Sequence, residues 1–94
     1  MQFALAPQNV VAKGRIVDES WGTEVRLDVT GLTGRQTVWF EQPDGTRASA
    51  GSFEGGNGGH VELVLSTAFK SKDAVALCVS PPNEPATLRA PLNA

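Results

Sequence analysis

The sequence has one cysteine, one histidine and no long apolar run. A lone Cys78 cannot form an internal disulfide bond, and Cys78 with His60 falls short of the four Cys and His ligands of a common structural zinc site. The pair also falls short of the two histidines and one cysteine of a blue-copper centre. We therefore expect no disulfide framework, no bound metal and no other cofactor.

Basic residues are not in excess either. Eight Lys and Arg against ten Asp and Glu leave a net charge of −2, so nothing is available to compensate a phosphate backbone, and nucleic-acid binding is disfavoured. The longest nearly apolar stretches, such as residues 74–79, are far shorter than the ~20 residues of a membrane helix. Residues 1–7 lack the basic and apolar regions of a signal peptide. We expect a soluble chain, with any targeting or anchoring segment outside these residues.

The length of 94 residues allows one hydrophobic core and not two. An apolar fraction of 40% with only 19% charged residues is typical of a folded chain and unlike the composition of disordered proteins. We predict a single domain over residues 1–94, with an ordered core at about residues 10–92.

Alternating side chains predict strands along most of the chain. The clearest strand is residues 23–30, where apolar Val25, Leu27 and Val29 alternate with charged residues. Residues 37–40 are apolar on both faces, as expected for a central strand that is covered on both sides. Further strands are predicted over residues 10–18, 47–54, 60–65, 74–79 and 87–90.

Ten glycines and six prolines mark the connections between these strands. Residues 43–45, Pro-Asp-Gly, predict a tight turn, and the glycine-rich residues 55–59 predict a flexible loop. Residues 80–85 read as an extended, polyproline-like segment, and residues 66–73 have room for one helical turn. Seven or eight short strands without an intervening helix predict an all-β fold, an antiparallel β-sandwich of the immunoglobulin or fibronectin type III-like class.

The candidate chemical groups do not form a recognisable catalytic set. His60 points outward at the start of a strand, where it is expected to be solvated, and no partner is evident. Cys78 faces away from the main core in the predicted register, and no motif places it with His60 as a nucleophile and base. Residues 55–59 lack the ending of a phosphate-binding loop. We predict no catalytic, cofactor-binding or metal-binding residue, and thus no enzyme; ligand-binding residues stay open.

Acidic and aromatic side chains leave two further alternatives. Six carboxylates at strand ends or on polar faces could pair for acid–base work or hold calcium, but solvated faces are the favoured interpretation. Trp39 is expected in the core because it lies in an apolar run. Trp21, between Ser20 and Gly22, is also favoured as a core residue, although an exposed indole would offer a platform for a peptide or a sugar. The six carboxylates are Asp18, Glu19, Glu24, Asp28, Glu41 and Asp44.

Several short segments, in order, carry a resemblance to a known family. They resemble the extracytoplasmic C-terminal domain of actinobacterial zinc-finger-type anti-sigma factors, over about residues 10–92. That family has a Trp-Gly-Thr-x-Val-x-Leu strand, a Gly-Leu turn, an apolar strand ending at Asp-Gly, a returning Gly-x-Trp/Phe strand and a final apolar-x-Val strand. The matching segments here are Trp21-Gly22-Thr23-Glu24-Val25-Arg26-Leu27, Gly31-Leu32, Val38-Trp39-Phe40, Asp44-Gly45, Ala50-Gly51-Ser52-Phe53 and Leu77-Cys78-Val79.

The resemblance implies a non-catalytic sensor or regulatory domain on the extracytoplasmic face of a bacterial membrane, acting in transcription regulation through a protein partner or regulated proteolysis. In that family, the sigma factor is bound by a separate N-terminal region with a His-x-x-x-Cys-x-x-Cys zinc motif, and one membrane helix follows it. Neither is in this sequence, so no zinc ligand and no sigma-contacting residue transfers. The alternative is a free-standing immunoglobulin-like module that recognises a protein or a glycan, which an exposed Trp21 would favour. The signal and the oligomeric state stay open.

Overall fold

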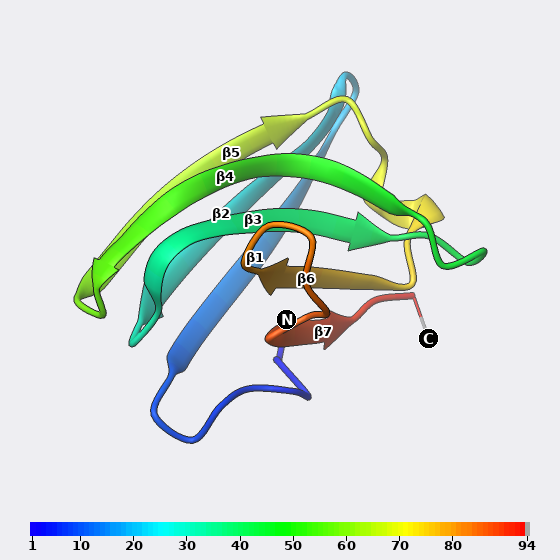
Figure 1. The fold of residues 1–94 in the computed structure, drawn as a ribbon. Helices are drawn as coiled ribbons and strands as arrows, with labels where there is room; N and C mark the ends of the chain where they lie inside the picture. Colours follow the sequence, from blue (N-terminus) through cyan, green and yellow to red (C-terminus); the bar gives the residue numbers. More distant parts are fainter. Residues whose placement is uncertain (94) are drawn as a thin grey trace.

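A computed structural model describes residues 1–93 as seven strands in two antiparallel sheets. The two sheets pack face to face around one apolar core (Figure 1). The predicted antiparallel β-sandwich of seven or eight strands is confirmed. One sheet has the order β1-β2-β5 and the other has the order β4-β3-β6-β7. The strands are β1 (Val11–Glu19), β2 (Gly22–Thr30), β3 (Thr33–Glu41), β4 (Arg47–Asn57), β5 (His60–Thr67), β6 (Ala76–Ser80) and β7 (Leu88–Pro91).

The strand order follows an immunoglobulin-like scheme. Strands β1, β2 and β5 form the smaller sheet, and β3, β6 and β7 are neighbours in the larger one. Strand β4 pairs with β3 and so extends the larger sheet, as the additional strands of variable-type domains do. A short helix, η1 (Ser71–Asp73), lies in the β5–β6 connection, where one helical turn was expected. Within residues 1–93, no helix has the length and apolar character that crossing a membrane would require.

The core is built from the strands that the alternation predicted. Val25, Leu27 and Val29 of β2 are almost completely buried, whereas the charged residues between them lie on the outer face. On β3, Val38 and Phe40 are fully buried in the main core. Because β3 lies between β4 and β6 and is apolar on both faces, the prediction of a central strand covered on both sides is confirmed.

Two predicted connections differ from the structure. Residues 55–57 are not a loop but the end of β4, and Thr33 of β3 pairs with Asn57. The backbone pairing holds the glycines that would otherwise be flexible, and a further hydrogen bond runs from the Gly31 N–H to the Gly58 carbonyl at 2.9 Å. The segment after β6 is a turn instead of an extended polyproline-like stretch. Asn83 adopts a left-handed φ of 62° and the Glu84 N–H donates to the Pro81 carbonyl.

The N-terminal segment lies along the edge of the larger sheet. The Ala4 N–H donates to the Arg89 carbonyl of β7 at 2.8 Å, and the Arg89 N–H donates to the Leu5 carbonyl at 3.1 Å. Phe3 then packs against the main core. This segment therefore pairs with the outer edge of β7, the last strand of the larger sheet. In the smaller sheet, β1 is an edge strand.

Candidate functional site

The outer face of the β1-β2-β5 sheet carries most of the charged side chains of these three strands. Side chains alternate along each strand, so the residues between the buried ones project from this face into solvent. A shallow groove of about 510 Å³ runs over it, with residues from all three strands along its walls. Its lining residues are Lys13, Gly14, Arg15, Arg26, Leu27, Asp28, Glu62, Leu63 and Val64.

Charges of both signs line this groove. Arg26 donates through Nε to the Glu24 carboxylate at 3.0 Å, so these two charges are paired along β2. Lys13 of β1 is the register partner of Asp28. Such a face suits ions or polar partners better than a purely apolar ligand, because most of the available groups are charged.

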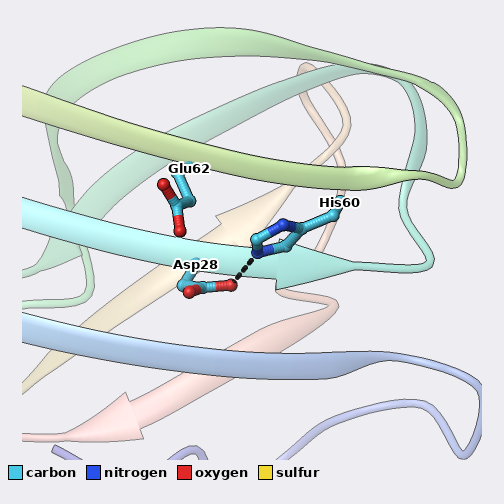
Figure 2. Close-up of side chains that lie close together, drawn as sticks. All are labelled: Asp28, His60 and Glu62. Atoms are coloured by element: carbon cyan, nitrogen blue, oxygen red, sulfur yellow. Dashed lines mark hydrogen bonds and ion pairs between the residues drawn. The ribbon is translucent and has the colours of Figure 1, made fainter.

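His60 has partners that the sequence did not reveal. Its Nε2 atom contacts the Asp28 carboxylate across the sheet, although the two residues are 32 positions apart. Glu62, two residues after His60 on β5, is paired in register with Asp28 and projects from the same face (Figure 2). One ligand atom from each of the three side chains lies within 4.8 Å of the other two. His60 is exposed to solvent, as predicted. The expectation that it has no partner is wrong, because its imidazole belongs to a cluster with Asp28 and Glu62.

Trp21 lies at the tip of the β1–β2 hairpin and is half exposed, at 50%. The expectation that it belongs to the core is wrong. The register pairs Glu19 with Gly22, so residues 20–21 form the connection and project beyond the end of the sheet. A side chain at the tip therefore lies beyond the two sheets that enclose the core. Trp39, which lies within β3, is only 7% exposed, as predicted.

Polar contacts tie this hairpin to the β5–β6 connection. The Lys70 ammonium group donates to the carbonyls of Glu19 and Ser20, at 3.2 and 2.7 Å. The Ser71 hydroxyl contacts the Asp18 carboxylate, and the Ser71 N–H donates to the buried Thr23 hydroxyl at 3.0 Å. The backbone beneath Trp21 is therefore held from both strands, and the indole is presented on a supported turn.

Trp39 and Cys78 form a separate, closed cluster on the outer side of the larger sheet. The Trp39 indole N–H donates to the Ser80 hydroxyl at 3.2 Å, and the Arg47 guanidinium lies 3.9 Å from the ring centroid. Arg47 in turn donates to the Glu84 carbonyl at 2.7 Å. Cys78 thus points away from the main core as predicted, yet it is completely buried under this cover.

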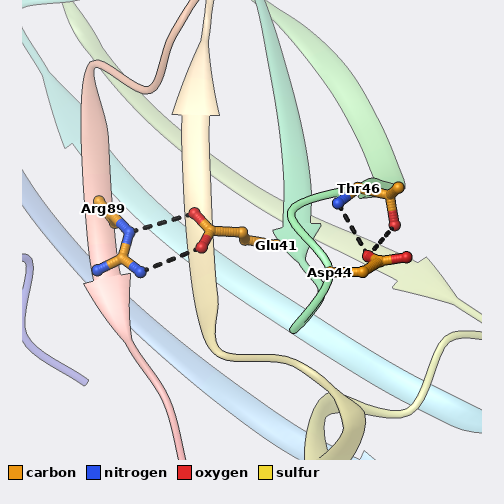
Figure 3. Close-up of polar contacts among 4 residues, drawn as sticks. All are labelled: Glu41, Asp44, Thr46 and Arg89. Carbon is orange, nitrogen blue, oxygen red and sulfur yellow. Dashed lines mark hydrogen bonds and ion pairs between the residues drawn. The ribbon is translucent and has the colours of Figure 1, made fainter.

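The six carboxylates have different neighbours and do not form one acid–base pair. Asp28 joins His60, and Glu24 joins Arg26. Glu41 accepts two hydrogen bonds from Arg89 (Figure 3), and the donor–acceptor distance in each is 3.3 Å. Figure 3 also shows Asp44 accepting from the hydroxyl and the N–H of Thr46, and these bonds, the hydroxyl first, lower the pKa of Asp44. The Glu41–Arg89 contact joins the end of β3 to β7, and the Asp44–Thr46 contacts hold the turn between β3 and β4.

No family model matches this chain, and no curated protein or solved structure matches it significantly. The site must therefore be interpreted from its own geometry. Two features of the smaller sheet remain without a structural explanation: the exposed Trp21 turn at one end and the Asp28–His60–Glu62 cluster at the other.

Burial makes Cys78 unreactive in the folded protein. It raises the pKa of the thiol from 9.0 to about 11, with a smaller contribution from the charge of Glu41. Because the thiolate is the reactive form, a thiol reagent at pH 8 should modify the native protein far more slowly than the urea-unfolded protein. Equal rates in the two states, followed by absorbance of the released chromophore, would contradict this placement.

The same shift predicts how stability depends on pH in the alkaline range. Well below pH 9 the Cys78 thiol is mostly protonated in both states, so it contributes little slope. Between about pH 9 and 11 the unfolded chain loses this proton first, and the free energy of unfolding therefore falls as the pH rises. Urea denaturation at pH 8 to 11 measures the fall, and the Cys78→Ala variant should show a smaller slope than wild type because this titration is removed.

Proposed function

We propose that this chain is a non-catalytic binding domain of the immunoglobulin-like class, which holds a protein partner through the Trp21 turn. The observation that carries the proposal is the half-exposed indole at the end of the β1–β2 hairpin. Tryptophan is enriched among the few residues that dominate binding energy in protein interfaces. An exposed indole also offers a large apolar area that a partner can bury.

The support beneath the turn favours binding as well. Lys70 holds the carbonyls of Glu19 and Ser20, and Ser71 joins the start of the hairpin to the β5–β6 connection. A side chain presented on a fixed backbone loses less conformational entropy when it is buried by a partner. A partner with an apolar pocket that accepts one indole ring would fit this arrangement.

Replacing Trp21 by alanine should separate binding from stability. Because the side chain is half exposed and lies outside the core clusters, we expect the free energy of unfolding to change by less than about 0.5 kcal/mol. Affinity for the partner should fall by about 2 kcal/mol or more, roughly thirtyfold. The partner is identified by chemical cross-linking in extracts of the source organism, then purified, and its affinity is measured by titration calorimetry.

Val64→Ala is the matched control, since Val64 is another exposed apolar residue, at 57%, on the outer face of the same sheet. Its affinity for the purified partner should equal that of the wild type. Trp21→Phe should recover part of the loss because it restores an aromatic ring. A partner that binds wild type and Trp21→Ala equally well would refute the role of the turn.

The resemblance described above suggests the biological setting of such a domain: the extracytoplasmic part of a membrane-anchored anti-sigma factor. In support, the Trp-Gly-Thr-x-Val-x-Leu segment runs from the hairpin tip into β2, and the Gly-Leu turn joins the two sheets. The test is the coding sequence upstream of Met1. An apolar span of ~20 residues preceded by a His-x-x-x-Cys-x-x-Cys motif would support this setting. A native start at Met1 would leave the free-standing binding module.

A further inference from the structure

The strongest unexplained side-chain cluster is Asp28, His60 and Glu62 on the outer face of the smaller sheet (Figure 2). His60 and Glu62 are two residues apart on β5, so both project from the same face. Asp28 of β2 is directly opposite Glu62 in the register and one pair away from His60. A His-x-Glu pair on one strand with a carboxylate across from it brings three ligands together without any loop.

We propose that these three residues bind a divalent transition-metal ion, with Zn²⁺ as the ion that fits best. The observation is the convergence of one imidazole nitrogen and two carboxylate oxygens, all within 4.8 Å of one another. Ligands of a tetrahedral zinc ion, at ~2.0–2.2 Å from it, lie roughly 3.3 Å apart. Binding would replace the direct contact between His60 Nε2 and the Asp28 carboxylate by an ion held between these atoms, and the half-exposed side chains can rotate to the required spacing.

The donor set selects the class of metal. An imidazole ligand favours Zn²⁺, Cu²⁺ or Ni²⁺ over Ca²⁺ and Mg²⁺, which prefer sites made of oxygen atoms alone. Three protein ligands also leave room for water in the remaining position, since the cluster is open to solvent.

The local charges support cation binding. Asp28 and Glu62 are neighbours on paired strands, and two like charges directly opposite each other repel. Lys13 is paired in register with Asp28 and offsets one of these charges, whereas Arg26 is already engaged by Glu24. A divalent ion would neutralise the carboxylates and link β2 to β5. The cluster is at the opposite end of the sheet from the Trp21 turn, so this inference does not depend on the proposed function.

His60 is the only histidine, which makes the test direct. Chelator-treated protein labelled with ¹⁵N is titrated with Zn²⁺, and the imidazole resonances are followed by NMR. We expect a saturable shift of these resonances at one equivalent of bound Zn²⁺, and no shift with Ca²⁺ or Mg²⁺ at the same concentrations. Zn²⁺ should also raise the melting temperature, because the ion binds only the folded sheet.

The variants His60→Ala, Asp28→Asn and Glu62→Gln should each weaken Zn²⁺ binding at least about tenfold, since even outer-shell changes cost that much. Glu19→Gln is the matched control: it removes an exposed carboxylate at the opposite end of the same sheet, and its Zn²⁺ affinity should stay within about twofold of wild type. Absence of saturable Zn²⁺ binding, retention of the affinity in His60→Ala, or an equal loss in Glu19→Gln would each overturn the proposal.

Discussion

Replacing Phe40 by alanine should lower the free energy of unfolding by about 3 to 5 kcal/mol. Phe40 is the largest fully buried side chain, at 0% exposure, and its ring stacks on Phe69 with the centroids 5.2 Å apart. It lies on β3, between β4 and β6, and belongs to the main core, so the cavity would open between the two sheets. Because small domains are stable by only ~5–15 kcal/mol, the variant should be close to unfolding at room temperature. Urea denaturation monitored by circular dichroism measures the loss.

Phe53→Ala provides the comparison for this prediction. Phe53 is the same residue type on the neighbouring strand β4, but it is only partly buried at the border of the core. We expect a loss of about half that of Phe40→Ala or less, since a partly exposed ring has less buried area to lose and solvent can enter the space it leaves. If Phe53→Ala proved the more damaging change, the core would be centred elsewhere than the structure places it.

Most strands could be predicted from the sequence because their signal is local. On β2, a period of two separates Val25, Leu27 and Val29 from charged neighbours, and the buried face needs no knowledge of the rest of the chain. The connections were harder. Asn83 turns the chain after two prolines by adopting a left-handed conformation, which prolines alone do not indicate.

The candidate sites depend on strand pairing, which the sequence does not display. His60 and Asp28 meet only because β5 pairs with β2 in one particular register, and a shift by one residue would place them on opposite faces. Trp21 was misplaced for a related reason. Its exposure follows from the pairing of Glu19 with Gly22, which puts residues 20–21 at the hairpin tip. The sequence indicates that Trp21 lies in a loop between Ser20 and Gly22, and the core was favoured only because large aromatic side chains are usually buried.

The hairpin that presents Trp21 depends on Gly22, and Gly22→Ala should cost about 3 kcal/mol of stability or more. Gly22 has a φ of 152°, and a Cβ atom there would lie 2.0 Å from the Thr67 carbonyl oxygen and 2.8 Å from the Ala68 Cα. Both obstacles are backbone atoms. Thr67 is held by its pairing with Thr23, so relief requires separating β2 from β5 at this end of the sheet.

Alanine variants at two other glycines distinguish the cost of the backbone conformation from the cost of the steric clash. A Cβ atom on Gly34 would meet nothing within 4 Å although φ is 70°, so Gly34→Ala should show only the cost of the left-handed conformation, about 1 kcal/mol. Gly59 also has open space around it and no such φ, so Gly59→Ala should change stability by less than about 0.5 kcal/mol. Thermal and urea unfolding of the three variants should rank them in this order. If Gly22→Ala proved as mild as Gly59→Ala, the close approach of β2 to residues 67–68 would be wrong, and with it the support beneath Trp21.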